Sequence, residues 1–432
     1  MPRRSHSNSS GVGRFIGHAV LITLLAVVCL VGGWVLGTLK PLPFLPGVTV
    51  STAPSQAGLP APSSSAPEEP SSVPVSSQAS SAPEGQEGMP DDNGLFSAYY
   101  DYAYAKMETM SVADLVGQVF IFRCPVNGAV KLIDDCQPAG YCLMADFFEP
   151  KTADQVRSTL ASYNNSSRTN MFFCCDEEGG TVVRISRYSQ FADQPFRSPR
   201  DVFAEGGFDA IESDTKEKAS LLKSLGLNRN LAPVADVSPN PQDFIYDREV
   251  GQDAAGTAEF VRLSVETYRA SGIACTLKHF PGYGNNADTH TGLAYDNRPM
   301  ETFDSSDFVP FRAGIEAKAP FVLVSHNVVS CMDPDAPASL SPAVHEILRE
   351  ELGVTGLILT DDLVMDAVTD FTGGKSAAVQ AFLAGNDLLL SSDCRNDYQA
   401  LYDAVESGEV PMATLKEAVV RVLAAKYALG IV

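Results

Sequence analysis

Side chains that can carry chemistry are concentrated between Lys278 and His290, a stretch that reads KHFPGYGNNADTH. Two of the six histidines of the chain, a lysine and an aspartate lie within these thirteen positions. An imidazole with a pKa of about 6.5 can give a proton and take one back, and a neighbouring carboxylate can orient the ring. The stretch is therefore a candidate for acid–base chemistry, although Asp288-Thr289-His290 taken alone is more typical of a solvated loop.

Other polar side chains follow short apolar runs elsewhere in the chain. They include Asp176, Glu177, Glu178 and Arg184, then Asp236 and a loop with Arg248, then His326 with Asn327, and finally Asp361 with Asp362. If the apolar runs are parallel strands that end at one rim, these side chains converge there. Buried charges require partners or a polar ligand. A polar pocket without an obvious set of metal ligands suits a sugar.

The elements that position these residues are eight apolar runs that alternate with helix-like segments. Eight strand–helix units predict an α/β fold, a (β/α)8 TIM-like barrel, which commonly takes about 250 residues or more. A doubly wound open sheet is the alternative, but no Gly-x-Gly-x-x-Gly follows the first strand. The expected strands are 116–122, 140–145, 171–175, 230–234, 273–277, 321–325, 356–360 and 387–391. The expected helices are 153–163, 211–225, 257–271, 307–317, 341–351, 377–384 and 415–429, after a first one that opens with a capping-box pattern at 111–114.

Composition narrows the class of partner. The formal net charge of −22 argues against electrostatic binding to nucleic acid or to an anionic membrane surface, because both need a basic face. The nine cysteines include no Cys-x-x-Cys pair, and Cys174-Cys175 lies in an apolar run, so buried thiols are favoured over a metal site. Disulfides stay open, because the compartment expected for the chain is not cytosolic.

Residues 15–39 contain no formally charged side chain, and 25 helical residues extend over about 37 Å, enough to cross a hydrocarbon core of about 30 Å. Three arginines precede this segment and only Lys40 follows it closely, so residues 1–14 are expected in the cytoplasm and the rest of the chain outside. The alternative is a cleaved signal peptide and a secreted protein. The long apolar part and a poor cleavage site favour a single-pass anchor in the cell membrane.

Residues 40–95 are dominated by Pro, Ser, Ala and Glu and have few large apolar side chains. Such a composition predicts a disordered, extended linker, whose expected role is distance from the membrane. A globular composition begins at residue 96, so 96–432 is expected to be one catalytic domain.

Several motifs, in order, resemble glycoside hydrolase family 3, and specifically its β-N-acetylglucosaminidase branch. The resemblance covers roughly residues 108–432. The motifs are Lys278-His279-Phe280-Pro281-Gly282 with Asp288-x-His290, Asp176-x-Glu178-Gly179-Gly180, Ala232-Pro233-Val234-x-Asp236-Val237, and Thr360-Asp361-Asp362-Leu363. The resemblance implies a barrel with a sugar subsite at the strand ends, and cleavage of terminal β-linked N-acetylglucosamine with retention of configuration.

The resemblance also implies roles for individual residues. Asp361 is the expected nucleophile that forms a covalent glycosyl-enzyme intermediate, and its neighbour Asp362 is expected to cap the following helix. His290, held by Asp288, is the expected acid and base. The expected sugar-binding residues are Asp176, Arg184, Arg248, Lys278 and His279. Ion pairing between Asp176 and one of these cations is the rival interpretation, and His326 stays unassigned.

Three departures from the family pattern bear on specificity. The family usually has histidine where this chain has Tyr283 and arginine where it has Thr181, and the segment from His279 to His290 is one residue short. These differences affect the substrate preference and the loop more than the reaction type.

The sequence therefore predicts a membrane-tethered exo-β-N-acetylglucosaminidase that acts on cell-wall muropeptides or related amino-sugar glycans without a metal or organic cofactor. The alternatives are a β-glucosidase of the same family and a non-catalytic wall-glycan binding protein on a degenerate barrel. A metal-dependent hydrolase is the remaining alternative, but His345-Glu346 does not continue to the second histidine of a zinc helix.

Overall fold

The computed structural model describes residues 88–90, 92–286, 293–365, 368, 371–372 and 376–432, which belong to the unit Ser80–Val432. The expected membrane segment 15–39 and most of the expected linker 40–95 lie outside the described residues. Among the helices that are described, none is both long and apolar enough to cross a bilayer.

Short parallel strands alternate with helices along the chain. The strands are β1 (Phe120–Arg123), β2 (Gly140–Cys142), β3 (Phe172–Cys175), β4 (Arg229–Asn230), β5 (Thr276–Phe280), β7 (Phe321–Val324), β9 (Leu357–Thr360) and β10 (Leu389–Ser391). One sheet has the order β10-β1-β2-β3-β4, a second has the order β5-β7-β9, and every pairing in both is parallel. The expected α/β fold with parallel strands is confirmed.

Isolated bridges connect the two sheets. Arg229 pairs with Ala274 and Val234 with Lys278, so β4 and the residues after it lie beside β5. Leu359 of β9 pairs with Leu388, directly before β10. Each sheet therefore meets the other at both of its edges. A further pair of two-residue strands, β6 (Tyr295–Asp296) and β8 (Val328–Val329), was not expected from the sequence.

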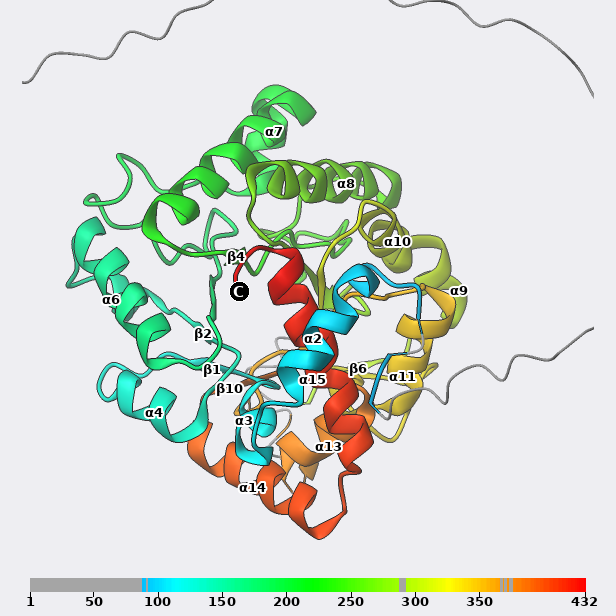
Figure 1. The fold of residues 1–432 in the computed structure, drawn as a ribbon. Coiled ribbons are helices and arrows are strands. Elements are labelled where there is room, and N and C mark those ends of the chain that lie inside the picture. Colours follow the sequence, from blue (N-terminus) through cyan, green and yellow to red (C-terminus); the bar gives the residue numbers. More distant parts are fainter. Residues whose placement is uncertain (1–87, 91, 287–292, 366–367, 369–370, 373–375) are drawn as a thin grey trace, which may run out of the picture. The chain divides into compact units, whose positions relative to one another are not determined.

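Helices surround these strands (Figure 1). They are α2 (Tyr100–Met107), α3 (Val112–Gly117), α4 (Ala129–Cys136), α5 (Ala145–Phe148), α6 (Ala153–Ser166), α7 (Pro199–Leu225), α8 (Ala254–Ser271), α9 (Met300–Thr302), α10 (Phe308–Glu316), α11 (Pro342–Glu346), α13 (Ala377–Ala384), α14 (Cys394–Ser407) and α15 (Met412–Ala428). Short 3₁₀ turns lie at η2 (Ser97–Tyr99) and η5 (Ala338–Leu340), and π-helical turns at η4 (Phe303–Asp307) and η6 (Ile347–Glu351).

Local sequence explains where many helices begin and end. The capping box expected at Ser111 forms, since its hydroxyl accepts from Asp114 N and the Asp114 carboxylate accepts from Ser111 N. Thr152 and Gln155 make a second box at the start of α6. Helix α8 ends at Gly272, which has a φ of 74°, a conformation that glycine adopts without the clash of a Cβ.

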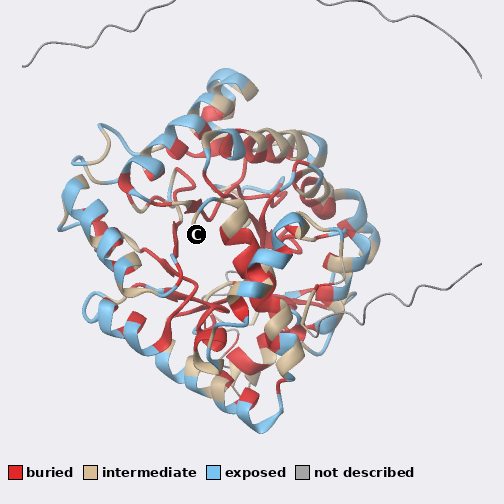
Figure 2. Ribbon diagram, viewed as in Figure 1, coloured by how far each residue is buried: buried red, intermediate tan, exposed pale blue. Residues whose placement is uncertain are grey.

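The core lies between the strands and the inner faces of the helices, while the outer helix faces are exposed (Figure 2). All residues of β3, β7 and β9 are buried, as expected for parallel strands covered on both sides. Phe172 and Phe321 meet edge to face at 5.5 Å. The guanidinium of Arg229 is fully buried 3.7 Å from the Phe321 ring centroid, and its Nε donates to Thr276 Oγ1 at 3.0 Å.

Helices α15 and α2 lie along each other across the amino ends of the strands (Figure 1). The buried Lys426 of α15 donates from Nζ to Gln118 Oε1 at 2.8 Å, just before β1. The chain enters the domain at this same end, because Leu95 N donates to Thr355 Oγ1 and Asp92 pairs with Arg421 at 3.6 Å. The carboxyl ends of the strands face away from α15 and α2.

Several expected boundaries were wrong. The first strand, expected from residue 116, starts at Phe120, because the Ser111 box extends α3 through Gly117. The strand expected at 230–234 is only Arg229–Asn230. The strand expected at 273–277 lies three residues later, so Lys278 and His279 belong to β5 and do not follow it. Helices α2, α4 and α14 were missed, and α7 starts twelve residues before the expected 211.

Candidate active site

A cavity of about 490 Å³ opens at the carboxyl ends of the strands and is called the carboxyl-end cavity below. Six residues predicted from the sequence line it: Asp176, Arg184, Arg248, Lys278, His279 and Asp361. The structure therefore brings the expected nucleophile and all five expected sugar-binding residues together. Asp288 and His290 lie outside the described residues.

A bulge in β5 explains how two consecutive residues reach the same cavity. The pairing of β5 with β7 shifts between Leu277, opposite Val322, and Phe280, opposite Val324, so β5 has one extra residue there. Side chains normally alternate between faces along a strand, and a bulge breaks that alternation. Lys278 and His279 can therefore both line the cavity.

Lys278 lies between two carboxylates. Its Nζ is 2.7 Å from Asp176 Oδ1 and 2.5 Å from Glu178 Oε1. Burial acts to lower the pKa of Lys278, but the charges of Asp176 and Glu178 outweigh it and raise the pKa above its ordinary value. The lysine is therefore a permanent cation, and the ion pair proposed for Asp176 as a rival interpretation exists in the ligand-free site.

Glu178 forms ion pairs with both Arg248 and Lys278. Arg248 donates to it with two nitrogens, at 3.0 and 2.8 Å, in a fork-to-fork pair. Burial acts to raise the pKa of Glu178, but Arg248 and Lys278 lower it strongly. Sequence reasoning quoted Glu178 as part of a motif and assigned it no role, although its place one turn after β3 was a usable signal.

His279 is oriented by Asp236, a residue that sequence reasoning placed at the rim without a role. Asp236 Oδ2 lies 2.7 Å from His279 Nδ1 and accepts from His279 N at 3.1 Å, and Oδ1 accepts from Tyr283 N at 2.7 Å. Nε2 of the ring lies 3.0 Å from Arg248 Nη2, which can only donate. The Nδ1 proton of the ring therefore points toward Asp236.

Asp361 follows β9 directly. Its Oδ1 accepts from Asp362 N at 2.8 Å, and its own N–H donates to Val324 O at 3.0 Å. Burial acts to raise the pKa of Asp361, but His326, His279, the Asp362 N–H and Lys278 together lower it below its ordinary value. The carboxylate is therefore ionised, as a nucleophile must be.

Asp362 and His326 support the loop that carries Asp361. Asp362 accepts from Ser392 N at 3.0 Å and from Val364 N at 3.4 Å, while burial raises its pKa. The helix that Asp362 was expected to cap falls largely outside the described residues. His326, left unassigned from the sequence, is fully buried, and its Nε2 donates to Asp362 O at 3.1 Å.

A second cavity of about 360 Å³ adjoins the first and shares Asp176, Arg184, Asp361 and Leu390 with it. Arg184 lies 3.4 Å from Asp176, and its backbone N–H donates to the buried Glu177. Asp361 thus lies between two spaces, each of which has polar and apolar walls.

The two unusual residues of the sequence also lie in the wall of the carboxyl-end cavity. Thr181 and Tyr283 both line it. The buried Tyr283 ring meets His279 edge to face at 5.0 Å and Phe244 at 5.6 Å, and Phe244 is 36% exposed at the cavity. The departure at Tyr283 therefore changes the wall beside His279.

The eight described cysteines are free thiols, and six of them, Cys174 and Cys175 included, are buried as expected. Within the described part of the chain, no group of three His, Cys, Asp or Glu residues is placed to hold a metal ion.

Comparison with known proteins places this arrangement in a family. Residues 112–425 match the family model described as the glycosyl hydrolase family 3 N terminal domain. A β-hexosaminidase from Xanthomonas campestris pv. campestris is 34% identical over 258 residues, which cover 58% of this chain and 76% of the relative.

Two solved structures are similar as well. A family 3 β-N-acetylglucosaminidase from Paenibacillus sp. has a TM-score of 0.70 and 28% identity, and the match covers 74% of this chain and 63% of that one. A β-N-acetylhexosaminidase from Beutenbergia cavernae has a TM-score of 0.67 and 26% identity, over 74% and 99% of the two chains. With its family model matched over most of the described domain, this chain belongs to glycosyl hydrolase family 3.

Proposed function

We propose that the chain is a retaining exo-β-N-acetylglucosaminidase in which Asp361 is the nucleophile. The observation that carries the proposal is an ionised, half-buried Asp361 between two cavities whose walls supply cations and hydrogen-bond donors. Membership of the family makes the protein a glycosidase. The sugar is inferred from the names of the relatives, which are a β-hexosaminidase and β-N-acetylglucosaminidases.

The first half of the proposed reaction forms a covalent intermediate. A carboxylate oxygen of Asp361 attacks the anomeric carbon, the bond from that carbon to the leaving oxygen breaks, and His290 gives its proton to the leaving oxygen. In the second half His290 takes a proton from water, whose oxygen displaces Asp361 from the anomeric carbon. The parts assigned to His290 and Asp288 rest on the sequence motif, since both lie outside the described residues.

The proposed grip on the sugar uses the remaining polar groups of the carboxyl-end cavity. Asp176 can accept from sugar hydroxyls, Lys278 and Arg184 can donate beside it, and the His279 ring forms part of the wall. Because Arg248 and Lys278 are already paired with Glu178, they keep fixed positions before substrate arrives. A site held in this way loses less entropy on binding.

We also propose that the eight strands close into a (β/α)8 barrel. The two sheets and the bridges between β4 and β5 and between β9 and β10 support a closed ring. In such a barrel the site is expected at the carboxyl ends, where Asp361 lies. A doubly wound open sheet would leave two sheet edges unpaired.

The proposed enzyme is tested with chromogenic N-acetyl-β-glucosaminide and β-glucoside substrates. Release from the first and not the second supports the assignment, while the reverse supports a β-glucosidase. No turnover of either, with glycan binding retained, supports a binding protein. Mass spectrometry after reaction with a fluorinated slow substrate is expected to find the sugar on Asp361, and a label on another residue would overturn its role.

The proposals of a muropeptide substrate and of a membrane anchor depend on the N-terminal sequence. An uncharged segment of 25 residues after three arginines supports a single-pass anchor with the domain outside the cytoplasm. Protease treatment of intact cells is expected to release the domain. Protection of the domain from protease would contradict this topology.

A further inference from the structure

A second large pocket lies at the opposite ends of the same strands. It has a volume of about 690 Å³ and is called the amino-end pocket below. Thr355, two residues before β9, and Asp387, two residues before β10, line it. Asp361, directly after β9, and Leu390 of β10 line the carboxyl-end cavity instead. Nothing in the proposed reaction uses the amino-end pocket.

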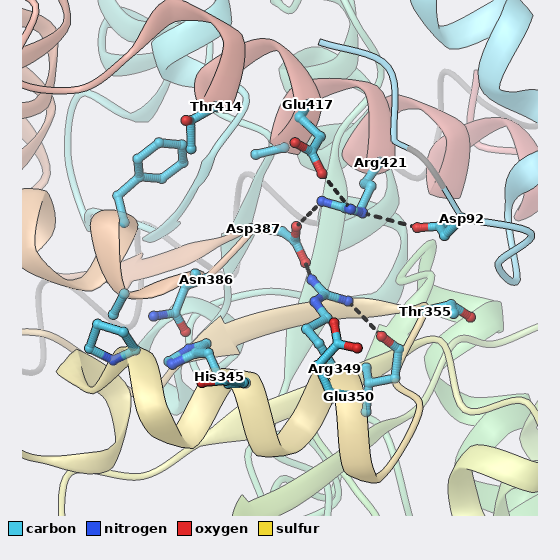
Figure 3. A pocket seen from close by; sticks show the side chains of 17 residues that line it. Asp92, His345, Arg349, Glu350, Thr355, Asn386, Asp387, Thr414, Glu417 and Arg421 are labelled. Atoms are coloured by element: carbon cyan, nitrogen blue, oxygen red, sulfur yellow. Dashed lines mark hydrogen bonds and ion pairs between the residues drawn. The ribbon is translucent and has the colours of Figure 1, made fainter. Parts of the chain in front are cut away.

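One side of the amino-end pocket is a branched network of ion pairs (Figure 3). Arg349 contacts Asp387 Oδ2 at 2.6 Å and donates to Val354 O and Gly356 O, while Arg421 pairs with Asp387, Glu417 and Asp92. These groups form ion pairs with one another and join α15, η6 and the residues before β10. Their role is structural.

The other side contains two buried acceptors that lack a donor. His345 is 3% exposed and Asn386 is 2% exposed, and neither His345 Nε2 nor Asn386 Oδ1 has a hydrogen bond of normal geometry within the described residues. Figure 3 shows the two side chains pointing toward each other in the pocket. Buried polar atoms without a partner are uncommon and costly.

The partners of each side chain decide the chemical character of the atom that is left without one. His345 Nδ1 is 2.8 Å from Ser341 O, a pure acceptor, so Nδ1 carries the proton and Nε2 of the neutral ring is an acceptor. Asn386 Nδ2 donates to Ser339 O at 2.9 Å and Ala381 O at 2.7 Å, and turning the amide over would lose both bonds. While the ring is neutral, both atoms are therefore acceptors and cannot satisfy each other.

The surroundings select the kind of donor. Five carboxylates and two arginines line the pocket, and the carboxylates of Glu346 and Glu350 have no ion pair within the described residues. An ammonium group has three donors for acceptors such as Nε2 and Oδ1, and its positive charge suits a pocket that also contains these two carboxylates. Apolar side chains, among them Phe382 and Val354, give a hydrocarbon stem something to pack against.

We propose that the amino-end pocket binds a primary ammonium ion carried on a short aliphatic chain, with His345 and Asn386 as its buried acceptors. The proposal is independent of the glycosidase assignment, because it concerns residues at the other end of the strands. A pocket of this volume is large enough for a small organic ligand.

The test is isothermal titration of the full chain with 1,4-diaminobutane at pH 7.5, with 1,4-butanediol and potassium chloride at equal ionic strength as comparison ligands. Saturable binding of the diamine alone supports the proposal. Equal binding of the diol overturns the role of charge. The absence of saturation up to about 10 mM, where ΔG is only about −2.7 kcal/mol, overturns the proposal and leaves water as the occupant.

Variants locate the binding. His345→Gln is expected to weaken the diamine about tenfold, since a hydrogen bond to a charged group is lost. Glu350→Gln, at the exposed rim, is expected to weaken it about threefold, and the exposed Glu409→Gln is the matched control with no change. Circular dichroism of each variant checks folding, and the rim variant still tests the proposal if His345→Gln does not fold. Equal affinity in Glu350→Gln and the control would place the diamine elsewhere.

Discussion

The two ends of β9 and β10 carry charged residues that are arranged in different ways. At the amino end, Arg349, Asp387 and Arg421 use one another as partners and join three segments of the chain. At the carboxyl end, Asp361 accepts a hydrogen bond from the N–H of its neighbour and lies between two cavities. Charges that are satisfied within the fold stabilise it, whereas a charge with unused capacity is available to a substrate.

The largest expected effect is the loss of the nucleophile. Asp361→Asn is expected to lower kcat/KM by about 10⁴-fold or more, because an amide cannot form the intermediate. Diamine affinity at the amino-end pocket is expected to stay unchanged. The exposed Asp209→Asn is the matched control. Substantial turnover by pure Asp361→Asn would remove this residue from the mechanism.

At the amino end of the strands, a substitution is expected to lower stability and to leave activity nearly unchanged. Arg349→Met removes three interactions and leaves the buried Asp387 with fewer partners, so the free energy of unfolding is expected to fall by about 2 kcal/mol. Urea unfolding of the full chain measures the change. At 25 °C, kcat is expected to stay within about twofold of the parent value, as befits a change confined to stability. A large loss of kcat with unchanged stability would break the distinction between the two ends.

A smaller effect is expected for Asp236, which orients His279 in the wall of the carboxyl-end cavity. Both carboxylate oxygens of Asp236 accept hydrogen bonds, whereas asparagine has only one side-chain oxygen. In Asp236→Asn, either His279 or the Tyr283 N–H therefore loses its acceptor. We expect KM to rise about thirtyfold and kcat to change less, because the role of His279 is to bind the sugar. Steady-state kinetics with an N-acetylglucosaminide separate the two constants. A loss confined to kcat would give His279 a part in the chemical step.

The smallest effect is a pH dependence at the amino-end pocket. Burial lowers the pKa of His345 below its ordinary 6.5, and Arg349 lowers it further. The Ser341 carbonyl, Asn386 and Asp387 act in the opposite direction but do not outweigh burial. Diamine affinity is expected to be constant above pH 6.5 and to fall, by at most about tenfold per unit, as acid converts Nε2 into a donor. The other charged groups that face the pocket are Glu346, Glu350, Glu417, Asp92 and Arg421. Affinity that rises in acid would contradict the assignment of Nε2 as an acceptor.

The sequence predicted the strands best where apolar runs were long and isolated. Strands β3, β7 and β9 begin and end within one residue of expectation. The run at 273–277 was misplaced because Lys278 and His279 were treated as loop residues, and charged side chains inside a buried strand are too uncommon to expect. They belong to β5 because Asp176, Glu178 and Asp236 lie close enough to pair with them.

The site was predictable as a set of residues and less so as a network. The sequence predicted one site for Asp176, Arg184, Arg248, Lys278, His279 and Asp361, and all six line the carboxyl-end cavity, while their roles stay predictions. The contacts of Glu178 and Asp236 depend on distances between elements far apart in sequence, which no local pattern contains. The places of Asp288 and His290 relative to Asp361 stay predictions.

The entry of the chain beside Thr355 has a practical consequence. Because Asp92 and Leu95 dock at the amino ends of the strands, anything joined to the N-terminal side of the domain is attached at the pole opposite Asp361. Immobilising the protein through that side on a resin or sensor chip therefore leaves the mouth of the carboxyl-end cavity unobstructed. Coupling through the carboxyl-end loops would not.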